Sequence, residues 1–218
     1  LYAIDYVDYK TYQVRKYGAH GTSHKYVSQA AAEYLGKKPE ELKIITCHLG
    51  NGSSISAVDG GKCIDTAMGF TPLAGVPRGT RSGVSDAAAV EFLCRKKGMN
   101  IHDGLTYLNK KCGMLGVSGV SSDYRDLTAA AKEGNYRAQL ALNMFSYACK
   151  KYVGSYMAAL GGLDVIVFTA GVGENTPHIR ASILKDMEFF GIEIDEAKNN
   201  YKNDGAIHEI SKDGSRVK

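Results

Sequence analysis

Apolar residues near the start of the chain repeat every three to four positions, the period of an amphipathic helix. This pattern predicts a helix over residues 24–35, with Thr22 or Ser23 as its N-cap and Gly36 ending it. Its expected apolar stripe consists of Val27, Ala31 and Tyr34 or Leu35. Tyrosines that precede it, mostly three or four apart, favour an irregular helix packed on a neighbour: Tyr2, Tyr6, Tyr9, Tyr12 and Tyr17.

Three short strands follow, predicted over residues 43–48, 53–58 and 62–66. The first two are joined by a tight LGNG turn, in which Gly50 and Gly52 are expected to have positive φ. An Asp-Gly-Gly sequence joins the second and third, and is a strong hairpin signal. We therefore expect the chain to form three consecutive antiparallel strands here.

The remainder is mainly helical in pattern. Residues 68–83 are rich in Gly, Pro and Thr, and an irregular segment of this length indicates a functional loop. The clearest buried strand is 164–169, whose continuous apolar run is typical of a covered parallel strand. An AGVGENT loop follows it, and a last strand is expected to begin at SRVK. Helices are predicted over 85–97 and 101–111, after Asp123, and over 136–160 and 176–190. The order of elements predicts one α/β domain whose last elements are missing.

Composition narrows the class of protein. The 218 residues are 44% hydrophobic and 23% charged, which argues against disorder, and no apolar run is long enough for a membrane span. The net charge of +4 is diffuse, so it suits an anionic small ligand better than a nucleic acid. Five widely spaced cysteines indicate reduced thiols in a cytoplasmic protein. The start has neither a signal peptide nor a Met, so we expect a fragment.

Three glycine-bearing segments are candidates for binding phosphate. Residues 48–54, HLGNGSS, form either an anion nest of backbone N–H groups or a plain hairpin turn. Residues 170–176, AGVGENT, follow the strongest strand and precede a helix, where α/β sheets bind ligands. In 79–83, GTRSG, Arg81 stands between glycines, either to stabilise a transferring phosphoryl group or as a mobile surface arginine.

Two further segments have open interpretations. His20 and His24, in GAHGTSH, are candidates for ligands, acid–base groups or a structural cap, and a metal site would need a third ligand. The segment SSDYRD, residues 121–126, has the pattern of a helix cap.

Together these segments resemble the acetate kinase family. The resemblance rests on five motifs in the family's order and spacing: RKYGAHGTSHKYV, ITCHLGNGSSISAV, DTAMGFTPLAG with GTRSG, SSDYRD and FTAGVGENTPHIR. It implies the ribonuclease H-like, actin-like ATPase fold (β-β-β-α-β-α-β-α). It further implies that residues 1–218 are the single C-terminal nucleotide-binding domain of a two-domain kinase. In that scheme residues 1–36 are a linking segment and helix, and 37–218 are the core.

The resemblance also implies the site residues. Arg81 and His20 take the positions that stabilise the transition state, whereas His24 receives no catalytic role. The remaining matched positions bind nucleotide. They are the phosphate-binding turn His48, Leu49, Gly50, Asn51 and Gly52, the adenine and ribose segment Asp123, Tyr124 and Arg125, and the second nucleotide loop Gly171, Val172, Gly173, Glu174 and Asn175.

The implied reaction transfers the γ-phosphoryl group of ATP to acetate, giving acetyl phosphate and ADP, with Mg²⁺ held by residues outside this chain. Propionate or butyrate as acceptor, and a non-enzymatic nucleotide-binding or dimerisation module, are the alternatives. The family forms homodimers through its C-terminal halves, and the helix over 136–160 has apolar surface for this. Because catalytic residues of the family's first half are absent, the isolated chain is expected to be inactive.

Three positions depart from the family's pattern. Ala19 stands where Phe is usual, Arg78 where an apolar residue is usual, and Val84 where an acidic residue is usual. The change at Val84 removes a carboxylate expected to orient Arg81.

Overall fold

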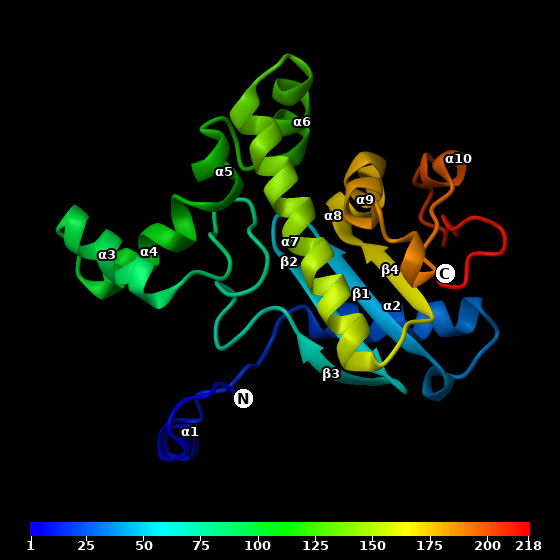
Figure 1. Ribbon diagram of the computed structural model, residues 1–218, viewed down its shortest axis with the longest axis horizontal. Coiled ribbons are helices and arrows are strands. Elements are labelled where there is room, and N and C mark those ends of the chain that lie inside the picture. Colours follow the sequence, from blue (N-terminus) through cyan, green and yellow to red (C-terminus); the bar gives the residue numbers. More distant parts are fainter. The chain divides into compact units, whose positions relative to one another are not determined.

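The computed structural model describes residues 1–218 and divides the chain into two compact units (Figure 1). The first unit contains Leu1–Ala19 and Thr66–Leu142, and the second contains His20–Asp65 and Asn143–Lys218. Each unit is described by itself below. The expected linking segment over residues 1–36 and core over 37–218 remain a prediction.

The second unit is built on a four-stranded mixed sheet in the order β3-β2-β1-β4. Its strands are β1 (Lys43–Leu49), β2 (Ser53–Asp59), β3 (Lys62–Thr66) and β4 (Val165–Thr169). β1 is antiparallel to β2 and parallel to β4. All four strands were predicted within one residue at each end, because short apolar runs and the Asp-Gly-Gly turn are strong local signals. The α/β class is therefore confirmed.

β4 lies at the edge of this sheet, and only Val165 among its residues is buried. The prediction of a strand covered on both faces was therefore wrong for this chain, although the parallel pairing was right. The outer edge of β4 is bonded to the last residue instead: Lys218 N donates to Asp164 O, and Ile166 N donates to Lys218 O.

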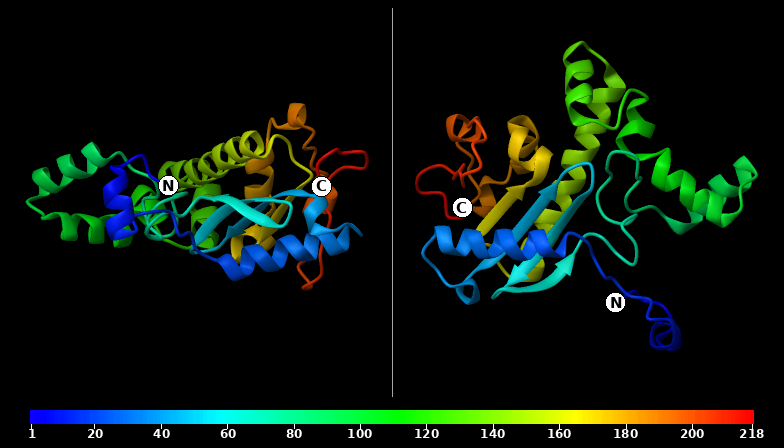
Figure 2. Two further views of the ribbon diagram at one scale, coloured as in Figure 1. Left: turned by 90° about the horizontal axis from the view of Figure 1, so that it is seen from below. Right: turned by 180° about the vertical axis from the view of Figure 1, so that it is seen from behind.

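Helix α2 (Gly21–Tyr34) covers one face of the sheet (Figure 2). It ends as predicted, with Gly36 at a φ of +65°. Its N-cap is His20 at a φ of +60°, not Thr22 or Ser23, and no side chain caps the helix. Its buried residues are His24, Ser28, Ala31 and Ala32, so the buried stripe is rotated from the predicted one. Two of these buried residues, His24 and Ser28, are polar.

Helix α7 (Tyr136–Leu160) lies along the opposite face of the sheet over its second half (Figure 2). The buried residues of this part recur every three to four positions: Phe145, Ser146, Cys149, Val153, Tyr156, Met157 and Leu160. α7 has the predicted bounds, because this period is sustained over its whole length. Neither α7 nor any other helix has the length and apolarity needed to cross a membrane.

Short helices complete the second unit: η1 (Pro39–Glu41), α8 (Ala170–Asn175), α9 (Pro177–Leu184), η2 (Glu188–Phe190) and α10 (Glu196–Asn199). The predicted AGVGENT loop is therefore mostly the helix α8. The helix predicted over 176–190 ends at Leu184, since Lys185 is extended and Asp186 has a φ of +58°. Of the weakly alternating tail, only the bridge between Ile194 and Ser211 pairs as a strand.

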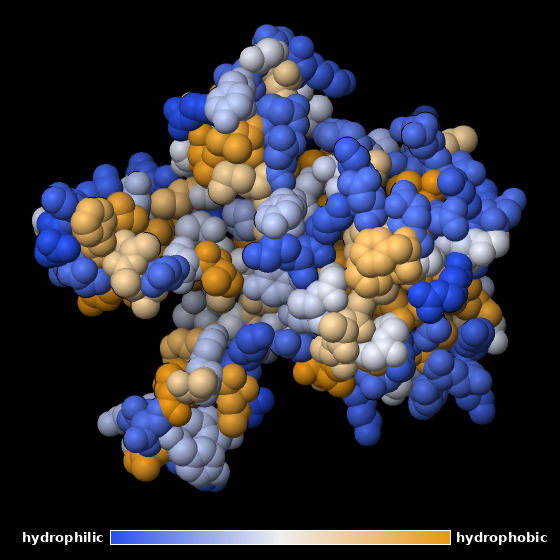
Figure 3. Space-filling view, viewed as in Figure 1, coloured by the Kyte–Doolittle hydropathy of each residue, from blue (hydrophilic) through white to orange (hydrophobic).

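The first unit is helical. It contains α1 (Tyr6–Tyr12), α3 (Ala87–Lys97), α4 (Ile101–Lys110), α5 (Gly113–Ser118), α6 (Tyr124–Lys132) and the start of α7. Carboxylate or amide side chains cap α1, α3, α4 and α6, since Asp5, Asp86, Asn100 and Asp123 each accept a backbone N–H. No residue of α1 is buried, so the packing predicted for its tyrosines is not found. Apolar side chains are accordingly visible on α1 in Figure 3.

Candidate functional site

Three histidines gather on one side of the sheet in the second unit. His20 and His24 are four residues apart, which places both side chains on the same face at the start of α2. His48 is the penultimate residue of β1. The ring of His20 stacks on that of His48, with centroids 4.0 Å apart, and the ring of His24 lies edge-on to His48 at 6.2 Å.

Hydroxyl groups surround this cluster. Ser54 Oγ lies 2.8 Å from His20 Nδ1 and 2.7 Å from His24 Nε2. Thr46 Oγ1 lies 2.7 Å from His24 Nδ1, and Ser23 Oγ lies 2.8 Å from His48 Nδ1. Burial lowers the pKa of His24 to about 4, with help from the two neighbouring imidazoles. Burial also lowers the pKa of His48, against the opposing effect of Glu174. His24 is therefore neutral at physiological pH.

The His48–Gly52 turn lies directly beside this cluster. A Cβ atom built on Gly52 would lie 3.3 Å from His20 Nε2, so glycine here lets the ring approach the backbone. Neither Gly50 nor Gly52 has the positive φ that we expected. The turn is instead closed by Gly50 N donating to Gly52 O and by a hydrogen bond from Ser53 Oγ to Gly50 O. Gly50 and Gly52 are therefore favoured because a side chain would crowd neighbouring atoms, not because the backbone has a positive φ.

The second predicted nucleotide segment meets this turn at the same edge of the sheet. His48 and Thr169 are paired in the parallel register of β1 and β4, so the residues after both strands emerge together. The Cβ of Ala170 lies 3.7 Å from a Cβ built on Gly50. Gly173 packs against both strands, whereas a Cβ on Gly171 would meet no atom within 4 Å. Gly171 is exposed, so the surface in front of it is open.

The polar side chains of this segment are engaged within the chain. Glu174 Oε1 accepts hydrogen bonds from Thr169 Oγ1 and from Ala170 N, each at 3.0 Å. Asn175 Nδ2 donates to Gly171 O at 2.9 Å. The buried guanidinium of Arg180 donates to the carbonyls of Gly173 and Glu174. These bonds hold α8 in place, and they use the side chains of Glu174 and Asn175 as hydrogen-bond partners within the chain.

Arg81 lies in the first unit, in the long irregular segment before α3. The backbone around it is bonded to the last turn of α4 and to the residue before α5: Ser82 N donates to Leu108 O, and Cys112 N donates to Thr80 O. Gly113 makes this approach possible, because a Cβ there would lie 1.9 Å from Arg78 O and 2.5 Å from Arg81 O. The backbone on both sides of Arg81 is therefore held by hydrogen bonds to other segments of the first unit. The role of Arg81 itself stays a prediction.

Arg78 explains how this segment keeps its shape. Its side chain is fully buried, and its guanidinium donates to the carbonyls of Ala74, Val76 and Leu73, at 2.9, 3.0 and 2.9 Å, and to that of Pro72. An apolar residue would leave these carbonyls without a donor. Val84 is exposed, and nothing in the structure explains its departure from the family's pattern.

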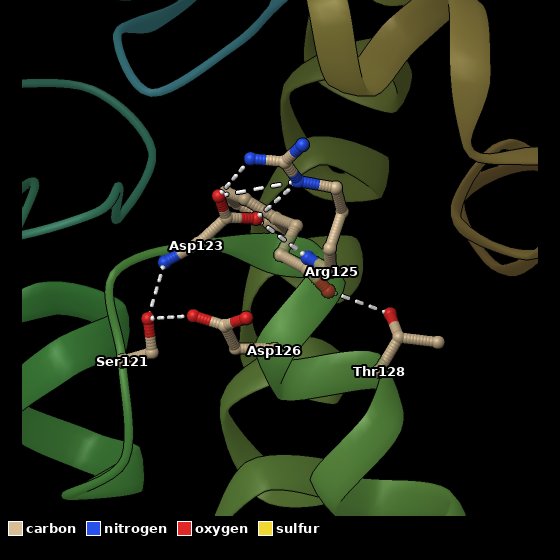
Figure 4. Close-up of polar contacts among 6 residues, drawn as sticks. Ser121, Asp123, Arg125, Asp126 and Thr128 are labelled. Atoms are coloured by element: carbon tan, nitrogen blue, oxygen red, sulfur yellow. Dashed lines mark hydrogen bonds and ion pairs between the residues drawn. The ribbon is translucent and has the colours of Figure 1, made fainter.

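The adenine and ribose segment predicted over Asp123, Tyr124 and Arg125 forms the start of α6 in the first unit (Figure 4). Asp123 Oδ1 accepts from Arg125 N at 2.8 Å, and Arg125 Nη2 lies 2.6 Å from Asp123 Oδ2. Hydrogen bonds from Arg125 lower the pKa of Asp123 to about 2. Asp123 and Arg125 therefore form a charged pair at the surface, whereas Tyr124 is buried.

The sequence interpretation missed the residues that support the site. Thr46, Ser54 and Arg180 were part of the quoted motifs but received no role, and Ser23 was considered only as a helix cap. Alternation along β1 and β2 was the available signal, because it places Thr46 and Ser54 on the face of the sheet that α2 covers. The structure contains no group of three or more His, Cys, Asp or Glu side chains placed to hold a metal ion, and all five cysteines are free thiols.

Comparison with known proteins relates the chain to one family. The model of the acetokinase family matches residues 1–218. Acetate kinases of Acetivibrio thermocellus and Thermoanaerobacterium thermosaccharolyticum are 57% and 58% identical over the whole chain, which covers 54% of each. The chain thus spans about half the length of these curated relatives.

Solved structures agree with this relationship. An acetate kinase from Porphyromonas gingivalis superposes with a TM-score of 0.96 at 48% identity, over 100% of this chain and 54% of the other. A propionate kinase from Francisella tularensis superposes with a TM-score of 0.86 at 44% identity, over 91% of this chain and 51% of the other. The fold is therefore that of the solved acetate kinases, and its mixed sheet is consistent with the actin-like ATPase fold.

Proposed function

Because this chain belongs to the acetokinase family, we propose that it is the nucleotide-binding part of a carboxylate kinase. The proposed reaction transfers the γ-phosphoryl group of ATP to acetate and yields acetyl phosphate and ADP, reversibly. The observation that carries this proposal is the position of His20, whose Nε2 faces Gly52 in the turn at the end of β1. An N–H donor beside a phosphate-binding turn is suited to charge that develops on a transferring phosphoryl group.

The acceptor carboxylate needs no general base, because it is ionised at neutral pH. Catalysis then depends on alignment of the two substrates and on neutralising charge at the equatorial oxygens. In this scheme His20 and Arg81 neutralise that charge. The phosphates lie against the His48–Gly52 turn and Gly171–Asn175, and Asp123–Arg125 contacts adenine and ribose.

We further propose Mg²⁺ as the metal, with protein ligands that lie outside this chain. The role suits a nucleotide substrate, because Mg²⁺ binds through one or two carboxylates together with phosphate oxygens and waters. It would supply charge neutralisation between the β- and γ-phosphates.

A protein of the relatives' length would supply further residues of the active site. We therefore propose that this chain alone has little or no kinase activity. Propionate is a second candidate acceptor, because a solved relative is named a propionate kinase; butyrate is a third. A non-enzymatic nucleotide-binding or dimerisation module is the alternative from a different class. Retention of both His20 and Arg81 favours the kinase, since simple binding needs neither.

Homodimerisation is part of the proposal. Tyr136, Met144 and Tyr147 on α7 have exposed fractions of 76%, 44% and 65%, which provides apolar surface for a second copy. Sedimentation equilibrium would detect the dimer. A cytoplasmic location is proposed from the free thiols.

Calorimetric titration with ADP and Mg²⁺ tests the nucleotide half-site directly. We expect binding by this chain and its loss in Gly171→Leu, a substitution for which the structure has room. Binding by both proteins would contradict the role of the Gly171–Asn175 segment. No binding by a chain that circular dichroism shows to be folded would leave it as a scaffold. Turnover of acetate, propionate and butyrate by a protein of full family length would then decide the acceptor.

A further inference from the structure

Ser54, His24 and Thr46 form a continuous line of hydrogen-bonded groups that ends at His20. Thr46 and Ser54 are completely buried, and His24 is 5% exposed. The contacts run from Thr46 Oγ1 to His24 Nδ1, from His24 Nε2 to Ser54 Oγ, and from Ser54 Oγ to His20 Nδ1. All three distances lie between 2.7 and 2.8 Å, so each contact requires one hydrogen between its two atoms.

The hydrogens available to this line are limited. A neutral imidazole carries one N–H, and each hydroxyl carries one O–H. His24 is neutral at physiological pH because its pKa is lowered to about 4. Ser54 can therefore donate to only one of its two histidines, and His24 can donate to only one of its two hydroxyls. The direction of the bond between His24 and Thr46 therefore fixes the direction of the bond between His24 and Ser54, and Ser54 can donate to His20 only when it does not donate to His24.

Three arrangements place one hydrogen in each contact when His20 is neutral. In the first, Thr46 donates to His24 Nδ1, His24 Nε2–H donates to Ser54, and Ser54 donates to His20 Nδ1. In the second, every bond is reversed. In the third, Thr46 donates to His24, and both His24 Nε2–H and His20 Nδ1–H donate to Ser54, whose own hydrogen lies outside the line. Only the first arrangement places the hydrogen of His20 on Nε2.

The buried hydroxyls of Thr46 and Ser54 distinguish the three arrangements. The only side-chain hydrogen bond of Thr46 is the one to His24 Nδ1, and this hydroxyl is shielded from water. The second arrangement would make Thr46 an acceptor and leave its hydrogen buried without an acceptor, which is costly. The third would leave the hydrogen of the completely buried Ser54 without an acceptor in the same way. The first arrangement uses every hydrogen of the three buried residues.

We propose that Thr46, His24 and Ser54 are positioning residues that hold the hydrogen of neutral His20 on Nε2, the nitrogen that faces Gly52. This inference rests on the proposed function only for its purpose: an N–H at Nε2 is a donor aimed at the predicted phosphate-binding turn. A hydrogen on Nδ1 would present a lone pair to the phosphoryl oxygens instead. The hydroxyl of Thr46, which makes no hydrogen bond to His20, thus helps to determine the tautomer of His20 through His24 and Ser54.

Nitrogen-15 NMR of the histidine side chains in this chain tests the inference without any activity. At a pH where His20 is neutral, we expect hydrogen on Nε2 of both His20 and His24. A His20 that carries its hydrogen on Nδ1 would overturn the proposal with no variant needed.

Thr46→Val is the decisive variant, because it removes with almost no change in volume a hydroxyl whose only side-chain hydrogen bond is to His24. We expect the neutral His20 of this variant to populate both tautomers. Ser54→Ala should have the same effect at closer range. Ser28→Ala, which removes a buried hydroxyl from the same helix but outside the line, should leave the His20 signals unchanged. His20 signals that stay unchanged in both Thr46→Val and Ser54→Ala would refute the relay.

Kinetics of a protein of full family length add a second readout. We expect Thr46→Val to lower kcat about 10-fold, with KM for the nucleotide changed less than about 2-fold, as for loss of an orienting partner. An unchanged kcat together with an altered tautomer would show that the hydrogen on His20 Nε2 does not contribute to catalysis. A protein without kinase activity would refute the proposed function, whereas the tautomer of His20 would still decide whether the relay exists.

Discussion

The ring of His20 is stacked on that of His48, with the two planes inclined by 19°. His20 caps α2, and His48 stands near the end of β1, so the stack joins the helix to the strand at the edge where the predicted phosphate-binding turn lies. The same stack brings His20 Nε2 against Gly52. The position of this nitrogen therefore depends on both the helix cap and the turn.

Gly52→Ala is expected to displace the His20 ring. The added Cβ would lie 3.3 Å from Nε2, and because the φ of Gly52 is not positive, alanine brings no backbone strain of that kind. In a protein of full family length we expect kcat for acetate to fall about 10- to 100-fold. Gly154→Ala on α7, where a Cβ meets no atom within 4 Å, is the matched control. Equal kcat values in the two variants would contradict a role for this nitrogen.

The buried histidine His24 should make stability depend on pH. Its pKa is about 4 in the folded chain and about 6.5 when unfolded, so between these values the unfolded state binds more protons. Its contribution is fully present above pH 6.5 and is lost as the pH falls toward 4. The total loss is about 3 kcal/mol. Urea unfolding at several pH values should show a smaller slope for His24→Gln than for the parent. Parallel curves for the two proteins would refute the assignment.

Gly113→Ala is expected to disrupt the segment that carries Arg81. The added Cβ would lie 1.9 Å from Arg78 O, and the φ of +60° adds strain. Gly98→Ala is a matched control, because Gly98 has a similar φ of +63° but open space around it. We expect a loss of about 1 kcal/mol for Gly98→Ala and about 3 kcal/mol more for Gly113→Ala. Chemical denaturation measures both, and equal losses would show that the close approach is unimportant.

Arg81→Ala should abolish turnover and spare nucleotide binding. If Arg81 stabilises the transferring phosphoryl group, its loss lowers kcat by about 10³- to 10⁵-fold in a protein of full family length. Nucleotide affinity, measured by calorimetry, should change little. Arg95→Ala on α3 removes an exposed arginine that contacts only Glu91 and the ring of Phe92 on the same helix, and it should leave turnover unaltered. A large loss of affinity with turnover preserved would exclude the role proposed for Arg81.

Local signals in the sequence determined most of the elements. Short apolar runs next to turn sequences located β1, β2 and β3 to within one residue, and a helical pattern located α7, because these patterns depend only on neighbours along the chain. Asp123 was recognised as a cap for the same reason. The motifs also located the candidate site residues, but their roles remain predictions.

Only the tertiary structure decided which residues support one another across the chain. His24, Thr46 and Ser54 lie on three different elements, and their hydrogen bonds appear only when α2 packs on β1 and β2. The N-cap at His20, the short helix α8 and the exposed edge of β4 were likewise not predicted. The physical reason is that burial, close approach and hydrogen-bond pairing between distant residues outweigh the weak preferences of individual residues for a local conformation.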